Sequence, residues 1–199
     1  MYQAVTTATR RRGIVWVSKV VVGITSLWPI GAQFLALATP THRPMEEMHG
    51  GCASYQMNLE PEFRAMSGFA QPVMTWPAQG EPRALLSLLK PIAATLLPLD
   101  HVSLTIEPKR PGAYAGIVGL RIPTTGHYRV SLSASAWIEI VTETGRIEPI
   151  AFEMQSHCPT LFKTILYSLE AGTFYWLETS ASVDELTILL TPDLPADHK

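Results

Sequence analysis

The densest group of side chains able to bind a metal ion lies between residues 42 and 52. It combines imidazole and thioether groups at His42, Met45, Met48 and His49 with the thiol of Cys52. Imidazole and thioether ligands suit copper. The first four residues therefore form a candidate copper or other soft-metal site. The competing interpretation is a solvated tail, because residues near a chain terminus are commonly disordered.

The sequence contains few patterns typical of catalysis. It has no Gly-x-Ser-x-Gly nucleophile elbow and no glycine-rich phosphate loop ahead of a helix. The carboxylates Glu139, Glu148 and Glu153 flank predicted strands. A glycosidase needs two such groups, but a pair can be picked from any β-protein this acidic. We therefore expect a non-enzymatic protein that needs no cofactor.

Aromatic residues supply a second set of candidates, for binding. Tyr175 and Trp176 are adjacent in a predicted strand, so they must point to opposite faces. The outward ring, or that of Trp137, is placed to stack on a sugar or contact a partner. The alternative is that the outward ring is shielded by a loop such as the proline-rich segment.

The first 38 residues have the order of an export signal. The basic residues Arg10, Arg11 and Arg12 precede an apolar run, Val20 to Ala38, that ends in Ala-Leu-Ala. This order is typical of a cleaved signal peptide, and a membrane anchor is the alternative. We expect cleavage after Ala38 and a soluble, periplasmic or secreted protein that meets the membrane only before cleavage.

The net charge of the chain limits the class of molecule that it is expected to bind. The chain has 15 Lys and Arg against 17 Asp and Glu. Four of the basic residues lie in the signal, so residues 39–199 carry 11 basic and 17 acidic groups, a net charge of −6. Nucleic-acid binding needs clustered basic side chains. The partner is therefore expected to be a ligand or an envelope protein, not a nucleic acid.

The two cysteines, Cys52 and Cys158, favour one disulfide in an exported chain. It would join the irregular N-terminal part to the later β-rich part. If it draws these ends together, Met57, Met154 and His157 can join the ligand-rich segment. A pair of thiolate metal ligands is the alternative.

Residues 39–99 form a proline-rich, irregular segment that we expect to pack on the main domain. A short helix is predicted from Glu60 to Met66, because Pro61 suits a first helical turn. The apolar spacing from Ala84 to Leu97 also predicts one or two helical turns, interrupted at Pro91.

From residue 100 to 192 the apolar residues alternate with polar ones, the period of half-buried strands. An all-β fold follows, an antiparallel β-sandwich of jelly-roll-like form, with residues 193–199 as a tail. The predicted strands are 102–106, 128–132, 137–141, 148–154, 164–169, 173–179 and 186–190. In 126–133 the apolar residues are expected to face inward, and Arg129, Ser131 and Ser133 to face water.

Two resemblances accompany this pattern. Ala-Gly-Thr-Phe-Tyr-Trp-Leu at 171–177 resembles the β-sandwich modules of secreted bacterial proteins, including pre-peptidase C-terminal domains. More widely, Cys-Ala-x-Tyr (52–55), Gly-x-Tyr-Arg-Val-x-Leu-Ser (126–133), Trp-Ile-Glu-Ile-Val (137–141), Cys158 and Phe-Lys-Thr-Ile (162–165) resemble a family of small exported proteobacterial proteins. Its members are sometimes labelled homogentisate dioxygenase, an activity that needs a two-histidine, one-carboxylate iron site and a far larger chain. The resemblance implies fold and export, and no activity.

The sequence thus predicts an exported, non-enzymatic β-sandwich that binds a ligand or an envelope partner. The alternative function is periplasmic copper binding by segment 42–52.

Overall fold

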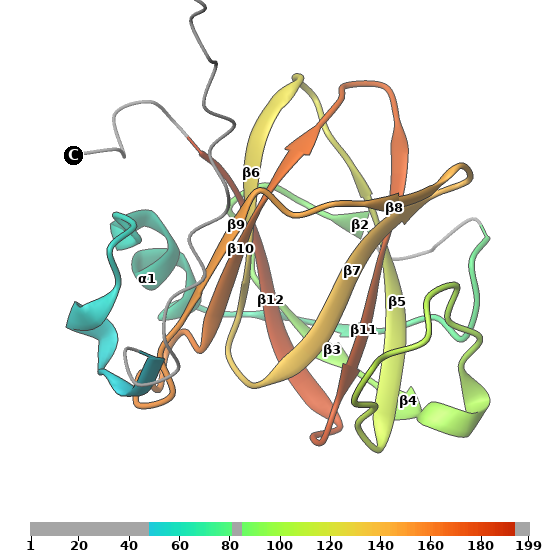
Figure 1. Ribbon diagram of the computed structural model, residues 1–199, viewed down its shortest axis with the longest axis horizontal. Helices are drawn as coiled ribbons and strands as arrows, with labels where there is room; N and C mark the ends of the chain where they lie inside the picture. Colours follow the sequence, from blue (N-terminus) through green and yellow to red (C-terminus); the bar gives the residue numbers. More distant parts are fainter. Residues whose placement is uncertain (1–47, 81–84, 194–199) are drawn as a thin grey trace, which may run out of the picture. The chain divides into compact units, whose positions relative to one another are not determined.

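Two β-sheets packed face to face make up the part of the chain that the structure describes. This is a computed structural model, and it describes residues 48–80 and 85–193 (Figure 1). The strands are β1 (Gln71–Met74), β2 (Leu85–Leu86), β3 (Ile92–Thr95), β4 (Leu97–Pro98), β5 (Tyr114–Arg121), β6 (Gly126–Leu132), β7 (Ala136–Thr142), β8 (Gly145–Ile147), β9 (Ala151–Met154), β10 (Lys163–Leu169), β11 (Phe174–Ala181) and β12 (Glu185–Pro192). Sheet A has the order β1-β3-β12-β6-β10-β9, and sheet B the order β2-β5-β11-β7-β8 with β4 also paired to β5. The predicted all-β sandwich is confirmed.

The chain crosses between the sheets at most connections. β3 of sheet A leads to β5 of sheet B, then to β6 of A and to the hairpin β7–β8 of B. The chain returns to sheet A for β9 and β10, crosses to β11 of B and ends in β12 of A. Two layers that exchange successive strands in this way form a jelly roll, and β9 adds an edge strand to one of them.

The core lies between the sheets, where the alternating residues of each strand meet. In β6, Tyr128, Val130 and Leu132 all face this core, as the alternation predicts. The same holds for Ile138 and Ile140 of β7. Because alternate side chains point to opposite faces, the remaining residues of these strands lie on the outer faces of the sandwich.

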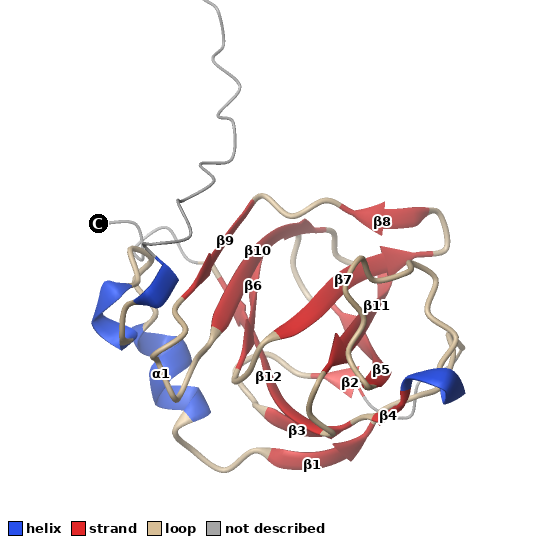
Figure 2. Cartoon of the chain, turned by 60° about the horizontal axis from the view of Figure 1, so that its bottom comes forward, coloured by secondary structure: helices blue, strands red, loops and turns tan. Residues whose placement is uncertain are grey.

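The outer face of sheet A is covered, contrary to the sequence prediction. Arg129 is 1% exposed and Ser131 is fully buried, whereas Ser133 is half-buried. The N-terminal segment with helix α1 (Glu60–Met66), which confirms the predicted helix, lies against this face (Figure 2). Glu62 of α1 makes an ion pair with Arg129. Alternation within one strand cannot show that another segment covers its polar face.

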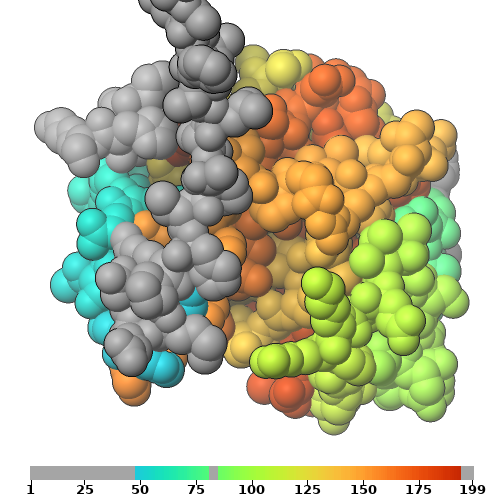
Figure 3. Space-filling view, in the orientation of Figure 1, coloured from blue at the N-terminus to red at the C-terminus, as the bar shows by residue number. Residues whose placement is uncertain are grey.

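The outer face of sheet B is covered by the loop from residue 102 to 113. The yellow-green region at the lower right of the space-filling view includes this loop (Figure 3). The strand predicted at 102–106 is wrong, because this stretch has no strand structure. Its apolar residues do lie against Trp176. The buried Glu178 side chain accepts hydrogen bonds from the main-chain N–H groups of Thr105 and Ile106. These N–H groups are therefore satisfied by a carboxylate and not by the carbonyl groups of a paired strand.

The proline-rich segment is less irregular than predicted, and the sandwich begins before residue 100. The helical turns predicted over 84–97 are wrong, since this stretch contains β2, β3 and β4. A short apolar run does not distinguish a helix from a buried strand, and pairing of β3 with β1 and β12 decides the outcome here. β1 and β2 pair in parallel with β3 and β5, so both sheets are mixed.

β5 was not predicted from the sequence, because its apolar and polar residues do not alternate. Its residues from Ala115 to Leu120 are buried on both faces. Gly116 is required by close packing, since a Cβ there would lie 2.2 Å from Thr75 Oγ1. Short helices of the 3-10 type at Cys52–Ser54 and Leu99–His101 complete the elements.

Several sequence predictions lie outside the described residues. They are the signal peptide at 1–38, His42, Met45 and residues 194–199 of the C-terminal tail. Within residues 48–80 and 85–193, no helix has the length and apolar character needed to cross a bilayer.

Candidate ligand-binding site

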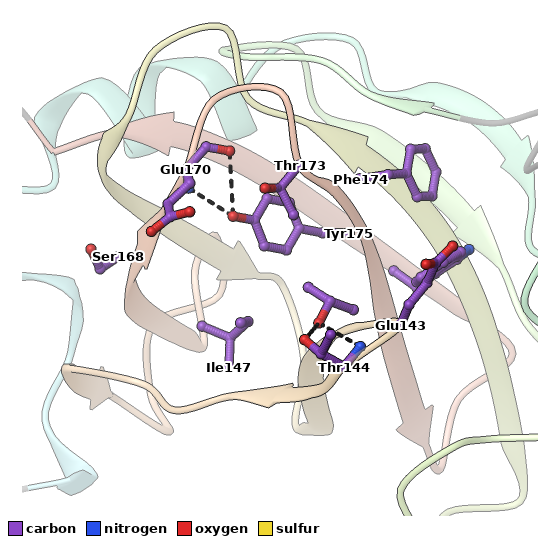
Figure 4. A pocket seen from close by; sticks show the side chains of 10 residues that line it. Glu143, Thr144, Ile147, Ser168, Glu170, Thr173, Phe174 and Tyr175 are labelled. Atoms are coloured by element: carbon purple, nitrogen blue, oxygen red, sulfur yellow. Dashed lines mark hydrogen bonds between the residues drawn. The ribbon is translucent and has the colours of Figure 1, made fainter.

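A pocket of about 540 Å³ opens at one end of the sandwich, where two turns face each other (Figure 4). This volume lies within the range of about 300–1,000 Å³ typical of small-molecule sites. One turn joins β7 to β8, and the other joins β10 to β11. The lining residues are Thr142, Glu143, Thr144, Ile147, Ser168, Glu170, Thr173, Phe174, Tyr175 and Trp176.

Strand pairing brings the two turns together. Trp176 of β11 lies opposite Val141 of β7 in the antiparallel ladder, so the start of β11 adjoins the end of β7. Gly145 and Gly172 have φ values of 134° and 82°. Both values fall in the region that favours glycine, and these residues allow the two chain reversals that border the pocket.

Hydroxyl side chains and three aromatic residues, Phe174, Tyr175 and Trp176, make up most of the pocket lining. Figure 4 shows the Tyr175 ring near the middle, with its hydroxyl directed toward Glu170. That hydroxyl accepts a hydrogen bond from the Glu170 main-chain N–H at 2.7 Å. The Thr142 and Thr144 hydroxyls lie 2.9 Å apart, and Ser168 is exposed. The pocket therefore presents several groups that both donate and accept hydrogen bonds.

The charge of the lining is negative. Glu143 and Glu170 come from the two opposing turns, and both are exposed. Among the residues that the structure describes, the lining contains no Lys, Arg or His. Carboxylates only accept hydrogen bonds when ionised, so the pocket suits a ligand rich in hydroxyl or amino donors and disfavours an anion.

The structure places the three predicted binding aromatics in different surroundings. Tyr175 faces the core and Trp176 the outer face of sheet B, as the strand geometry requires. The Trp176 ring is 8% exposed, and its Nε1–H donates to the Gly80 carbonyl at 3.1 Å. Shielding by the proline-rich segment, the alternative interpretation, is thus confirmed. Both residues still line the pocket.

Trp137 does not contribute to the pocket. It lies four residues before Val141 on β7, which is about 13 Å along a strand. Its side chain is half-buried on the outer face of sheet B. Thr144 and Thr173 in the two turns and Ser168 in β10, which do line the pocket, were missed because isolated hydroxyl residues carry no distinguishing pattern.

The candidate carboxylates from the sequence are engaged elsewhere. Arg146 forms ion pairs with both Glu139 and Glu148. Glu153 accepts a hydrogen bond from the Gln56 main-chain N–H at 2.8 Å. These three groups are therefore held by partners outside the pocket, and none of them lines it.

The predicted disulfide between Cys52 and Cys158 is confirmed. It lies in a small apolar cluster with Leu59, Leu161 and neighbouring side chains. The Tyr55 hydroxyl donates to the Leu161 carbonyl at 2.8 Å, and burial raises the pKa of this tyrosine. The bond fastens the N-terminal segment to the loop between β9 and β10.

The predicted metal ligands are only partly brought together. Met48 is 7% exposed, and its carbonyl accepts a hydrogen bond from the Ser156 main-chain N–H at 2.9 Å. From this residue on, the expected solvated tail is wrong. His49 lies beside His157, with ring centroids 6.2 Å apart. In the described part of the chain, no three His, Cys, Asp or Glu side chains form a metal-binding group.

Comparisons with protein-family models, curated proteins and solved structures found no match to this chain. The functional conclusion therefore depends on the chemistry of the pocket and of its surroundings.

Proposed function

We propose that the protein is an exported, non-enzymatic β-sandwich that binds a saccharide in the pocket between the β7–β8 and β10–β11 turns. The observation that carries this proposal is the composition of the lining, in which hydroxyls and two carboxylates surround the Tyr175 ring. Function is argued from this site and not from the jelly-roll fold, because one fold hosts many functions.

A saccharide matches each feature of the lining. Its hydroxyl groups donate to Glu143 and Glu170 and exchange hydrogen bonds with the threonine hydroxyls. Its apolar ring face fits against the half-buried Ile147 side chain, and the Tyr175 ring, which is 2% exposed, forms the inner wall opposite it (Figure 4). Neutral or amino sugars are favoured over acidic ones, because the described lining residues include two carboxylates and no basic group.

A glycan array carrying neutral, amino and acidic saccharides tests the proposal on the chain that begins at Thr39. We expect binding to neutral or amino sugars and none to acidic sugars. The Ser168→Trp variant places a bulky ring at the edge of the pocket, where Ser168 is exposed, and should abolish binding. The matched control is Ser182→Trp, in the exposed turn at the opposite end of β11, which should bind like the unaltered protein.

Three results would contradict the proposal. One is the absence of binding to any sugar on the array, and another is binding that survives Ser168→Trp. Release of a shortened sugar from a bound oligosaccharide would show that the protein is an enzyme and refute the non-enzymatic assignment.

Export is the second part of the proposal. It is supported by the order of basic, apolar and small residues in 1–38 and by the Cys52–Cys158 disulfide, since disulfides persist in oxidising compartments. The resemblance to small exported β-sandwich proteins agrees with it. The mass of the exported protein should correspond to a chain that begins at Thr39.

Cleavage after Ala38 can be tested by placing a bulky residue at the cleavage site. Ala38→Phe should block processing and leave the full-length chain, whereas Ala32→Phe, inside the apolar run, should not. Full-length unaltered protein in the membrane fraction would contradict cleavage and favour an anchor.

A further inference from the structure

Two histidines that are 108 positions apart come together beside the disulfide. The rings of His49 and His157 have centroids 6.2 Å apart and are inclined at 50°, and both residues are exposed. They lie at the start of the described N-terminal segment and in the β9–β10 loop, where the blue-green and orange ribbons meet in Figure 1. The approach of His157 to the segment that contains His49 agrees with the expectation that the disulfide draws these ends together.

The main chain around these histidines is fixed. The Ser156 N–H donates to the Met48 carbonyl at 2.9 Å, and the His157 N–H donates to the Gly50 carbonyl at 3.3 Å. The Gly50 N–H donates to the Gln155 side chain at 2.8 Å. Together with the nearby disulfide, these bonds fix the main chain that carries both imidazoles. The main chain at the site is therefore ordered before a ligand binds.

Hydrogen bonding determines which ring nitrogen is available. His157 Nδ1 contacts the His49 carbonyl oxygen, which only accepts, so Nδ1 carries the proton. In the neutral ring the lone pair is then on Nε2. His49 Nδ1 lies 3.0 Å from Ser156 Oγ, and in the tautomer whose Nδ1 donates to this hydroxyl the lone pair is again on Nε2. Within the described residues, neither Nε2 has a hydrogen-bond partner.

This arrangement is typical of metal-binding histidines, whose second ring nitrogen donates to an oxygen that fixes the ring. Metal–nitrogen distances of about 2.0–2.1 Å place two ligating rings roughly 5 to 6 Å apart, centre to centre. The observed centroid separation of 6.2 Å is close to this range, and exposed side chains change rotamer readily.

We propose that His49 and His157 form an open site for one Cu²⁺ ion, with both Nε2 atoms as ligands and water in the remaining positions. Imidazole ligands suit copper, and Cu²⁺ binds such sites more tightly than the other divalent ions of the series. The net charge of −6 for residues 39–199 also favours a cation. The site is independent of the saccharide pocket, because β10 separates the two ends by about 20 Å.

Calorimetric titration of the oxidised chain from Thr39 with Cu²⁺ tests the proposal, in a glycine buffer that competes for weakly bound copper. We expect one ion per chain, and an electron paramagnetic resonance spectrum that shows nitrogen ligands. His49→Ala and His157→Ala should each weaken binding about tenfold or more. The matched controls are His101→Ala and His127→Ala, exposed histidines outside the pair, which should leave the affinity unchanged.

Two further variants separate this site from other sources of copper binding. Ser156→Ala removes the oxygen that orients His49, and should weaken binding less than His49→Ala does. Bound copper should also raise the melting temperature, because it stabilises the folded state, and His157→Ala should remove this rise. Binding that is unchanged by His157→Ala, or is lost with His42→Ala alone, would overturn the proposal.

Discussion

Glu62 and Arg129 are 67 positions apart, and their side chains form an ion pair from which solvent is excluded. Glu62 Oε1 lies 3.2 Å from Arg129 Nη1, and the two side chains are 0% and 1% exposed. The same carboxylate accepts from the Thr191 hydroxyl, and Arg129 also pairs with Asp193. These contacts fasten helix α1 to the outer face of sheet A and to the end of β12.

Removal of the buried carboxylate should be costly. We expect Glu62→Ala to lower the free energy of unfolding by about 3–5 kcal/mol, because it leaves a buried cation with fewer partners. Glu60→Ala is the matched control in the same helix. Its ion pair with Arg64 is exposed, so its effect should stay below about 1 kcal/mol. Equal effects in denaturant unfolding would show that the outer face of sheet A is not sealed.

The disulfide should contribute strongly to stability. It joins residues 106 positions apart, and restriction of a loop this long in the unfolded chain is worth about 4–5 kcal/mol in theory, often less in practice. Cys52→Ala combined with Cys158→Ala should lower the free energy of unfolding by up to that amount. The unaltered protein, measured after full reduction, is the reference. Equal stability of its oxidised and reduced forms would contradict the expectation.

Both faces of β6 should be sensitive to truncation, to different degrees. Val130→Ala is expected to cost roughly 1–3 kcal/mol through lost burial and cavity formation. Ser131→Ala should cost about 1 kcal/mol, since the buried Ser131 hydroxyl donates to Thr164 at 3.0 Å. The exposed Ser182→Ala serves as control, with an effect within about 0.5 kcal/mol. A Ser131 variant as stable as this control would mean that water reaches the outer face.

Glu139 should make stability fall as the pH rises. Burial is the main cause that raises the pKa of Glu139 above its ordinary value of 4.5, although Arg146 acts in the opposite direction. The folded state therefore holds this proton more tightly than the unfolded chain does. Its contribution is complete below pH 4.5 and is lost as the pH rises through the folded pKa.

Glu139→Gln tests this dependence in unfolding experiments from pH 3 to 8. The variant should be more stable than the unaltered protein at neutral pH, and the difference should shrink below about pH 4.5. Glu148→Gln is a control with the opposite sign, because its hydrogen bond with Arg146 lowers the pKa of that exposed carboxyl. Stability differences that do not change with pH would contradict the shift at Glu139.

Part of the candidate site followed from the sequence alone. The opposite orientation of Tyr175 and Trp176 depends only on strand geometry, and both residues line the pocket. The hydroxyl and carboxyl groups on its two turns did not follow, because they become neighbours only when β11 pairs with β7. The pairing of His49 with His157 likewise depends on contacts made across the whole chain.

The elements that could be predicted from the sequence are those specified by residues close together in the chain or by a covalent bond. Alternation in β6, the proline that begins α1 and the isolated cysteine pair each specify a local or covalent constraint, and each prediction was confirmed. Tertiary structure decided the rest. β5 is buried on both faces and shows no period, and Arg129 is buried because α1 covers it. Burial of a strand's second face depends on segments far away in sequence, so no pattern within the strand can encode it.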